Sequence, residues 1–275
     1  MRRTVRPMVR FTSDDDLRGA ELVETDLTGA RFRFARLNGA SFSQSYLSGA
    51  VMRGVDLSGA DIDGMVDDLV LNGVDVAPLV EAELNRRYPG REHARSPRLD
   101  EQRASYDAAQ RTWDALVARA AALPAGIVDA SVDGEWSLAQ TLRHLVFATD
   151  AWARYGIRAA DDAFHPAGIP FSEYDDEAGQ LGVDLAATPS WDDVLAVRAD
   201  RVAQVRALYD ALSDEEFAGP ARRLPPWERE GRTLPVWRCL GVVVGEEWAH
   251  YRFAERDLAQ LERERHEDPT GAGHT

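Results

Sequence analysis

The segment from Asp16 to about Met65 repeats every five residues, and this period constrains the fold more than any other feature of the chain. The second place of each pentapeptide holds a large apolar residue, and the fifth place is mostly small. The second places are Leu17, Leu22, Leu27, Phe32, Leu37, Phe42, Leu47, Met52, Leu57 and Ile62. A period of five fits neither an amphipathic helix nor an alternating strand. It fits a coil with four sides of five residues each, whose stacking would bury one large and one small side chain per side.

This pattern resembles the pentapeptide-repeat family, whose members form a right-handed quadrilateral β-helix. Ten pentapeptides would make about two and a half coils, so we interpret the segment as a small folded appendage or cap. Some long members of the family act as acidic mimics of DNA. That role is disfavoured here, because the segment is short and its arginines nearly offset its acids.

After the repeats the sequence predicts a hairpin and then a region of helices. Asn72-Gly73 lies between β-branched residues and favours a tight hairpin, and Pro78 is placed to open a short helix. From Asp100 onward apolar residues recur at helical spacing, which predicts four long amphipathic helices, over about 100–124, 136–157, 190–212 and 233–267. Ser137 with Gln140, and Ser190 with Asp193, are typical of helix N-termini.

We therefore predict a mainly α protein, in which a four-helix bundle follows a small β segment. The predicted organisation is a leader over 1–15, the repeat β-helix and hairpin over 16–75, a short helix and linker over 76–99, the bundle over 100–265, and a disordered tail over 266–275. The long connection from Arg158 to Pro189 is rich in Pro, Gly and Asp. Connections of that size are usually functional or mobile.

Charge and cysteine content narrow the classes of function. The formal net charge of −15, from 47 acidic and 32 basic residues, disfavours nucleic acid and anionic membranes as partners. The one cysteine, Cys239, allows no intramolecular disulfide, which suits a reducing compartment. No apolar run approaches the length of a membrane span, and the N-terminus lacks the apolar core of a signal peptide. We expect a cytoplasmic protein. The sequence leaves open whether the protein forms a homodimer.

Three polar residues fall on faces that should point into the bundle. Glu246 and His250 are four residues apart on the last predicted helix, so they project from one face. His144 lies on the inward-looking stripe of the second predicted helix. Two imidazoles and one carboxylate would give a metal three protein ligands and leave positions open, as in a catalytic site. Spacing alone is a weak signal, because such pairs are common and a lone histidine is usually just hydrogen-bonded.

The stretches "WSLAQTLRHLVFA" and "GEEWAHYRFAERDL" resemble the DinB superfamily of four-helix proteins, which includes thiol-dependent maleylpyruvate isomerases and the mycothiol and bacillithiol S-transferases. The resemblance spans roughly residues 61 to 265. It implies a divalent metal held by His144, Glu246 and His250. Many members have histidine at the position of Glu246, whereas the thiol-dependent isomerase type has glutamate.

Neighbouring residues leave alternatives open. Glu247 could replace Glu246 as a ligand, accept a hydrogen bond behind the site, or be a solvated charge. His165, in the long connection, could line a pocket or be an ordinary loop histidine. Cys239 reads as a small buried apolar residue, since no cationic neighbours mark it as a nucleophile.

The expected function follows from the implied metal site. The metal would be Zn²⁺ first, with Ni, Mn or Fe as alternatives, and a low-molecular-weight thiol would be the cosubstrate. A metal-bound thiol or water would be the reacting group, and the partner would be a small electrophile. No catalytic side chain can be named. The competing interpretation is a non-enzymatic bundle that acts through protein contacts, with a structural or vestigial metal site.

Overall fold

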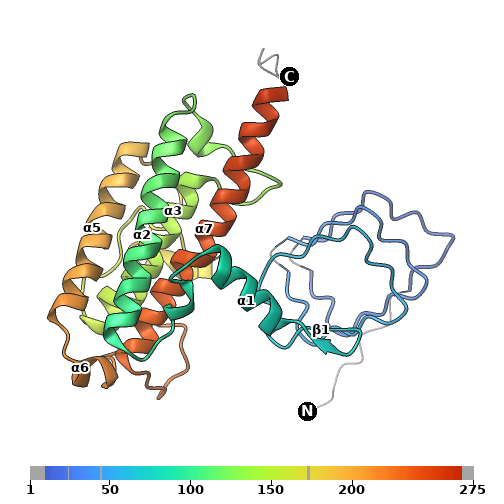
Figure 1. Cartoon of the computed structure of the whole chain (residues 1–275). Coiled ribbons are helices and arrows are strands. Elements are labelled where there is room, and N and C mark those ends of the chain that lie inside the picture. Colours follow the sequence, from blue (N-terminus) through green and yellow to red (C-terminus); the bar gives the residue numbers. More distant parts are fainter. Residues whose placement is uncertain (1–9, 24, 44, 172–173, 268–275) are drawn as a thin grey trace. The chain divides into compact units, whose positions relative to one another are not determined.

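The computed structural model describes residues 10–23, 25–43, 45–171 and 174–267 (Figure 1). The chain divides into two compact units, Met1–Val55 and Asp56–Thr275. The division comes earlier than the boundary at residue 75 expected for the repeat segment. Asp63, from a late repeat, belongs to the second unit, where it pairs with Arg252 at 2.5 Å and with Arg256 at 3.2 Å. Residues 1–9 of the predicted leader, and 268–275 of the predicted tail, lie outside the described residues.

The first unit is a succession of turns at ten-residue intervals. The backbone N–H of Ala20 donates to the carbonyl of Leu17 at 3.1 Å, and the same bond recurs at Ala30, Ala40 and Ala50. Each turn has glycine at its third place, with φ between 72° and 78°, where side chains other than glycine are strained. Alternate pentapeptides, those ending in Gly-Ala, therefore end in hydrogen-bonded turns.

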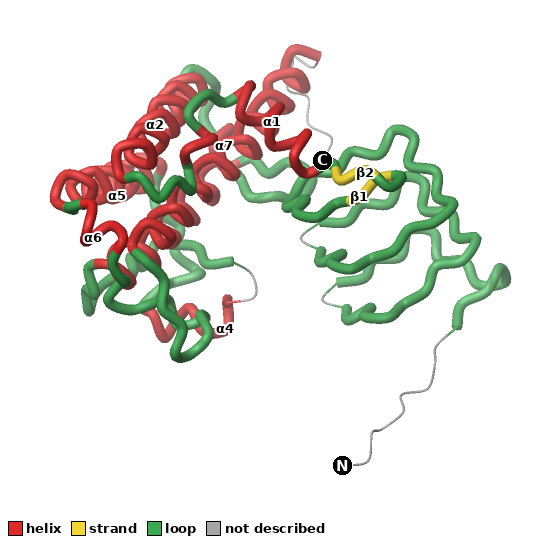
Figure 2. The backbone as a smooth tube through the Cα atoms, turned by 60° about the horizontal axis from the view of Figure 1, so that its bottom comes forward, coloured by secondary structure: helices red, strands yellow, loops and turns green. Residues whose placement is uncertain are grey.

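The large residues of the repeats are not enclosed as the sequence analysis expects. Leu17, Leu27 and Leu47 are 52%, 46% and 50% exposed, and the described part of this unit contains no strand ladder (Figure 2). Strand pairing would bring neighbouring coils to about 4.8 Å and close the space around these side chains. Without it they stay about half exposed.

The second unit begins with the predicted hairpin and short helix. Strand β1 (Val70–Leu71) pairs antiparallel with β2 (Val74–Asp75), with Val70 opposite Asp75. Asn72 and Gly73 between them both have positive φ, as this tight turn requires. Helix α1 (Ala77–Arg87) follows, with a proline in its first turn, as predicted.

Four long helices then form the bundle. They are α2 (Leu99–Ala121), α3 (Leu138–Thr149), α5 (Trp191–Ala211) and α7 (Val236–Glu267). Helix α2 packs against α5 and α7, and α3 also packs against α5 and α7. Helix α3 runs on into a π-helical turn, η3 (Asp150–Ile157), where the sequence predicts continuous α-helix. Ser137 forms the expected capping box with Gln140, and Ser190, expected as an N-cap, forms a capping box with Asp193.

Short elements connect the long helices. They are η1 (Arg91–His93), η2 (Ile127–Asp129), α4 (Asp175–Ala178), η5 (Gly179–Leu181) and α6 (Asp214–Ala218). Helix α6 has a capping box of its own, in which Ser213 pairs with Glu216. It lies in the connection between α5 and α7, where the sequence analysis expects no helix.

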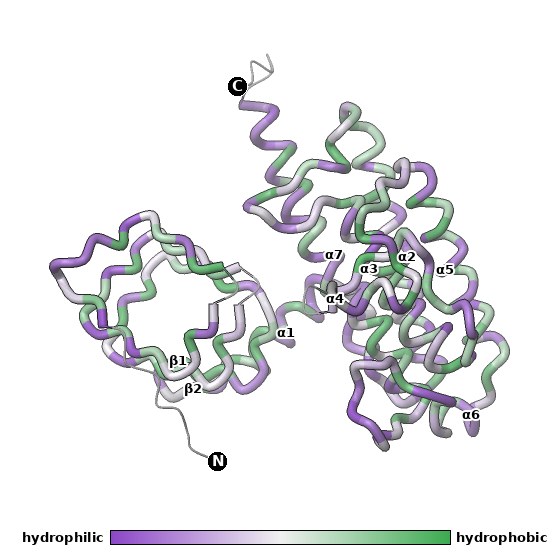
Figure 3. The backbone as a smooth tube through the Cα atoms, turned by 180° about the vertical axis from the view of Figure 1, so that it is seen from behind, coloured by the Kyte–Doolittle hydropathy of each residue, from purple (hydrophilic) through white to green (hydrophobic). Residues whose placement is uncertain are grey.

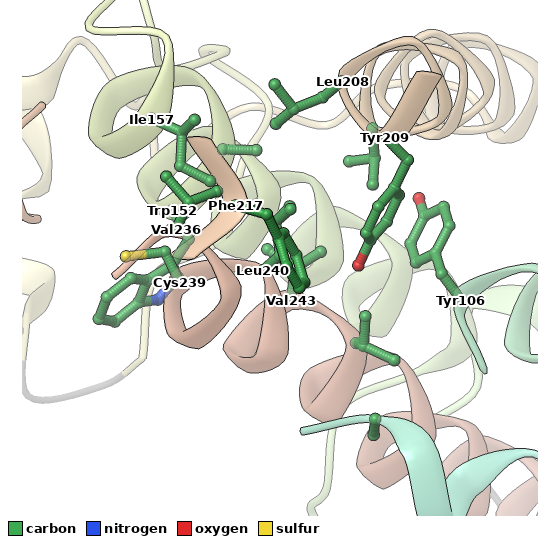
Figure 4. Close-up of a cluster of buried hydrophobic side chains, with 14 of the residues drawn as sticks. Tyr106, Trp152, Ile157, Leu208, Tyr209, Phe217, Val236, Cys239, Leu240 and Val243 are labelled. Atoms are coloured by element: carbon green, nitrogen blue, oxygen red, sulfur yellow. The ribbon is translucent and has the colours of Figure 1, made fainter. Parts of the chain in front are cut away.

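The core of the bundle is apolar and aromatic. Tyr106, Tyr209, Phe217 and Leu240 are almost completely buried in one cluster, which Figure 4 shows. The C-terminal end of α7 is hydrophilic (Figure 3), where Glu262 pairs with Arg119. In the described parts of the chain, no helix combines the length and apolar character needed to cross a bilayer.

Candidate metal centre

Helices α3 and α7 bring His144, Glu246 and His250 together. The His250 Nε2 atom lies 3.1 Å from Glu246 Oε2, and the His144 Nε2 atom lies 3.6 Å from the same oxygen. One potential ligand atom from each residue lies within 4.8 Å of the other two. The expected i,i+4 pair on one helix and the histidine on a facing helix are therefore adjacent.

The long connection after η3 orients the His144 ring. Its Nδ1 atom lies 3.0 Å from the carbonyl oxygen of Ile169. Because a carbonyl can only accept, Nδ1 is the donor in this bond, and Nε2 is the ring atom that lies toward Glu246. Metal-binding histidines are commonly oriented by such a bond on their second nitrogen.

The protonation states of the group favour metal binding. Burial acts to raise the pKa of Glu246, but the adjacent His144 and His250 side chains hold this pKa well below its usual range. Burial lowers the pKa of His250, although Glu246 opposes the effect. The carboxylate is therefore ionised and the His250 imidazole neutral near pH 7, which are the forms that coordinate metals.

Aromatic rings cover the two imidazoles. The Trp136 ring lies 4.6 Å from His144 and 5.9 Å from His250, measured between ring centroids. Phe253 meets His250 edge-on at 5.7 Å. Trp136 directly precedes the Ser137 cap of α3, so the start of this helix places the indole over the site. Nothing in the sequence spacing of Trp136 links it to the two histidines.

Glu247 lies outside the group and is not a solvated charge. Its side chain is fully buried and forms an ion pair with Arg198 of α5, which also donates to Gln110 of α2 at 3.1 Å. Of the two glutamates, Glu246 is the one that lies with His144 and His250. Consecutive residues of a helix point about 100° apart, so only one can face α3.

His165 also lies outside the group. Its backbone N–H donates to Asp150 Oδ2 at 2.8 Å, and its Nδ1 atom accepts from the N–H of Ala167 at 3.1 Å. Burial lowers the pKa of its imidazole. His165 therefore shapes the long connection and is not among the ligand atoms.

Arginines fasten this connection to α3 and η3. Arg143 donates to the carbonyl of Ala167 at 2.7 Å, and Arg154 donates to the carbonyl of Ala163 at 2.7 Å. These bonds hold the segment whose Ile169 carbonyl orients His144. No sequence signal could have identified them, because they join side chains to backbone atoms of an irregular segment.

The donor set fits a divalent metal. Imidazole nitrogens and carboxylate oxygens bind such ions at about 2.0–2.2 Å, so ligand atoms of one ion lie roughly 3–4 Å apart. Two of the distances here, 3.1 and 3.6 Å, are in that range. Within the described residues, no further His, Cys, Asp or Glu joins the group.

Two protein-family models match the chain. The family model of the DinB superfamily matches residues 108–254, and the model of pentapeptide repeats matches 16–44 and 30–64, with eight copies. No curated protein and no solved structure matches the chain. The DinB match covers more than half of the chain and contains His144, Glu246 and His250. The chain thus belongs to the DinB superfamily and carries pentapeptide repeats before its helical region.

Proposed function

We propose that this protein is a metal-dependent thiol S-transferase or thiol-dependent isomerase that acts on small electrophiles. The observation that carries the proposal is the group of His144, Glu246 and His250, which has three protein ligands and no fourth among the described residues. Three protein ligands are typical of catalytic sites, and four of structural sites. Glutamate at position 246 adds support, since it is the form that resembles the thiol-dependent isomerases.

A divalent metal bound here would supply Lewis acidity that keeps a small-molecule thiol ionised at neutral pH. Residues of the chain would supply charge, ligand orientation and shielding from water. Glu246 provides the one negative charge of the group, and the Ile169 carbonyl fixes the ring of His144. Trp136 shields both imidazoles on one side, which limits access of water there.

Zn²⁺ is the first choice of metal, because two nitrogens and one oxygen suit it well. Ni, Mn and Fe accept the same donors. Mycothiol, bacillithiol or another low-molecular-weight thiol would be the cosubstrate. We place the reaction in the cytoplasm, where such thiols stay reduced.

The competing function is a non-enzymatic bundle whose metal site is structural or vestigial. It is favoured by the pentapeptide repeats, which have no part in the proposed chemistry. For that region we propose the right-handed β-helix of its family, acting as a cap. The regular Gly-Ala turns support this form.

Metal content tests the site. Protein purified without a histidine tag should contain close to one equivalent of metal, measured by mass spectrometry. The variants His144→Ala and Glu246→Ala should lose most of it. His165→Ala is the matched control and should keep it, because this histidine lies outside the group. Equal metal in all four proteins would refute the site.

Thiol consumption tests the chemistry. Loss of mycothiol, bacillithiol or glutathione would be followed with a panel of epoxide, activated-alkene and halide electrophiles. We expect turnover with at least one thiol and none in the His144→Ala variant. Metal binding without consumption of any thiol would favour the non-enzymatic bundle.

A further inference from the structure

A buried ion pair lies directly behind the metal centre. Glu247 follows Glu246 in α7 and is completely buried, and its partner Arg198 on α5 is only 6% exposed. Arg198 also donates to the side-chain carbonyl of Gln110 on α2 at 3.1 Å. A charged pair is thus enclosed where three helices meet.

The backbone of the same residue is held as well. The indole N–H of Trp113, on α2, donates to the carbonyl oxygen of Glu247 at 3.2 Å. Glu247 is therefore attached to α5 through its side chain and to α2 through its backbone. One face of this turn of α7 is fixed to two helices, while another presents Glu246 and His250 to His144 on α3.

Stability alone gives a weak reason for such a pair. Removing two charges from water costs about as much as their attraction returns, and apolar residues of similar size often serve equally well or better. Three ligands on two helices, in contrast, must be held within roughly 0.5 Å of their working positions. A charge-assisted hydrogen bond has a preferred direction and length, so it adds a geometric constraint on the rotation of a helix.

We propose that Arg198 and Glu247 are positioning residues for the metal centre, which fix the rotation of α7 so that Glu246 and His250 face His144. They act through Glu246 and touch neither metal nor substrate. The inference rests on the metal site of the proposed function but not on the chemistry performed there.

The test separates positioning from stability with single and double variants. Arg198→Met and Glu247→Met each leave one buried charge without its partner, and each should lower the melting temperature of the metal-free protein. The double variant removes both charges, leaves the net charge unchanged, and should melt close to the wild type. Its affinity for Zn²⁺, measured in competition with a chromophoric chelator, should still fall about 10- to 100-fold, as for other residues that orient metal ligands.

The Co²⁺ absorption spectrum gives a second readout, because its shape depends on the arrangement of the ligands. It should change in the double variant. The control is Arg119→Met with Glu262→Met, which removes a pair between α2 and α7 that is remote from the site. This control should leave both the Zn²⁺ affinity and the Co²⁺ spectrum unchanged.

The possible outcomes distinguish the positioning role of Arg198 and Glu247 from the existence of the metal site. A double variant that binds Zn²⁺ as tightly as the wild type, with the same Co²⁺ spectrum, overturns the positioning role and leaves the metal site standing. A wild-type protein that binds neither ion overturns the site itself, and with it the proposed function and this inference.

Discussion

At the scale of single residues, the orientation of a potential metal ligand matters as much as its distance from the other ligands. His144 is useful at the candidate centre because its Nδ1–H donates to the carbonyl of Ile169, which turns the Nε2 atom toward Glu246. From the sequence, this histidine was expected on an inward-looking face, and Glu246 was paired with His250. The sequence could not assign the tautomer, because the carbonyl comes from an irregular segment 25 residues away. It also left Glu247 open as an alternative to Glu246, since the pairing of Glu247 with Arg198 exists only in the folded chain.

The reactivity of the Cys239 thiol can be predicted without reference to the metal. The thiol is fully buried in α7, and burial raises its pKa to about 12. At pH 8 such a thiol is ionised on the order of one part in ten thousand, and the thiolate is the reactive form. We therefore expect Ellman's reagent to detect almost no thiol in the native protein and one per chain in urea. Prompt reaction of the native protein would contradict the burial of this side chain.

At the scale of elements, the helices begin where local chemistry favours it. The capping boxes at Ser137 and Ser190 were predictable because both partners lie within four residues of sequence. The π-helical turn η3 could not be predicted in this way, since Asp150 at its start is bound by residues far away in the sequence. Asp150 accepts from Arg201 Nε at 2.6 Å and from the N–H of His165. Such turns depend on tertiary contacts that no local pattern contains.

The two caps allow a matched comparison. Ser137 is 4% exposed, whereas Ser190 is exposed to solvent. Ser137→Ala should lower the free energy of unfolding by about 1–2 kcal/mol, because water cannot replace the lost acceptor at a buried cap. Ser190→Ala should cost less, at roughly 0.5 kcal/mol. Urea unfolding of both variants measures the difference, and a larger loss for Ser190→Ala would show that burial does not decide the cost.

At the scale of the whole molecule, the chain consists of two units with different sequence patterns. The first has a period of five residues, and the second has helical spacing of its apolar residues. Period-five patterning predicted the repeats, and the regular Gly turns reflect it. It did not predict how exposed the large repeat residues are, because their burial depends on contacts between coils. The helical spacing was more informative, since helices pack along faces that the sequence itself defines.

The second unit should fold without the first. A chain of residues 56–275 keeps the hairpin, α1, the bundle and the pair between Asp63 and Arg252. We expect it to unfold cooperatively and to bind Zn²⁺ about as tightly as the full chain, since His144, Glu246 and His250 all belong to this unit. Circular dichroism melts and chelator competition would measure both properties. Loss of cooperative unfolding would mean that residues 1–55 are needed for the bundle to fold.

The indole of Trp136, which packs against the two histidine rings, can also report on the metal centre through its fluorescence. Trp136 lies within 6 Å of both imidazole rings, measured between centroids. The fluorescence of an indole is sensitive to the charge and protonation of its immediate neighbours. The emission of Trp136, isolated as the difference between the native protein and a Trp136→Phe variant, would thus act as a built-in optical probe. It would follow events at His144 and His250 without any attached dye.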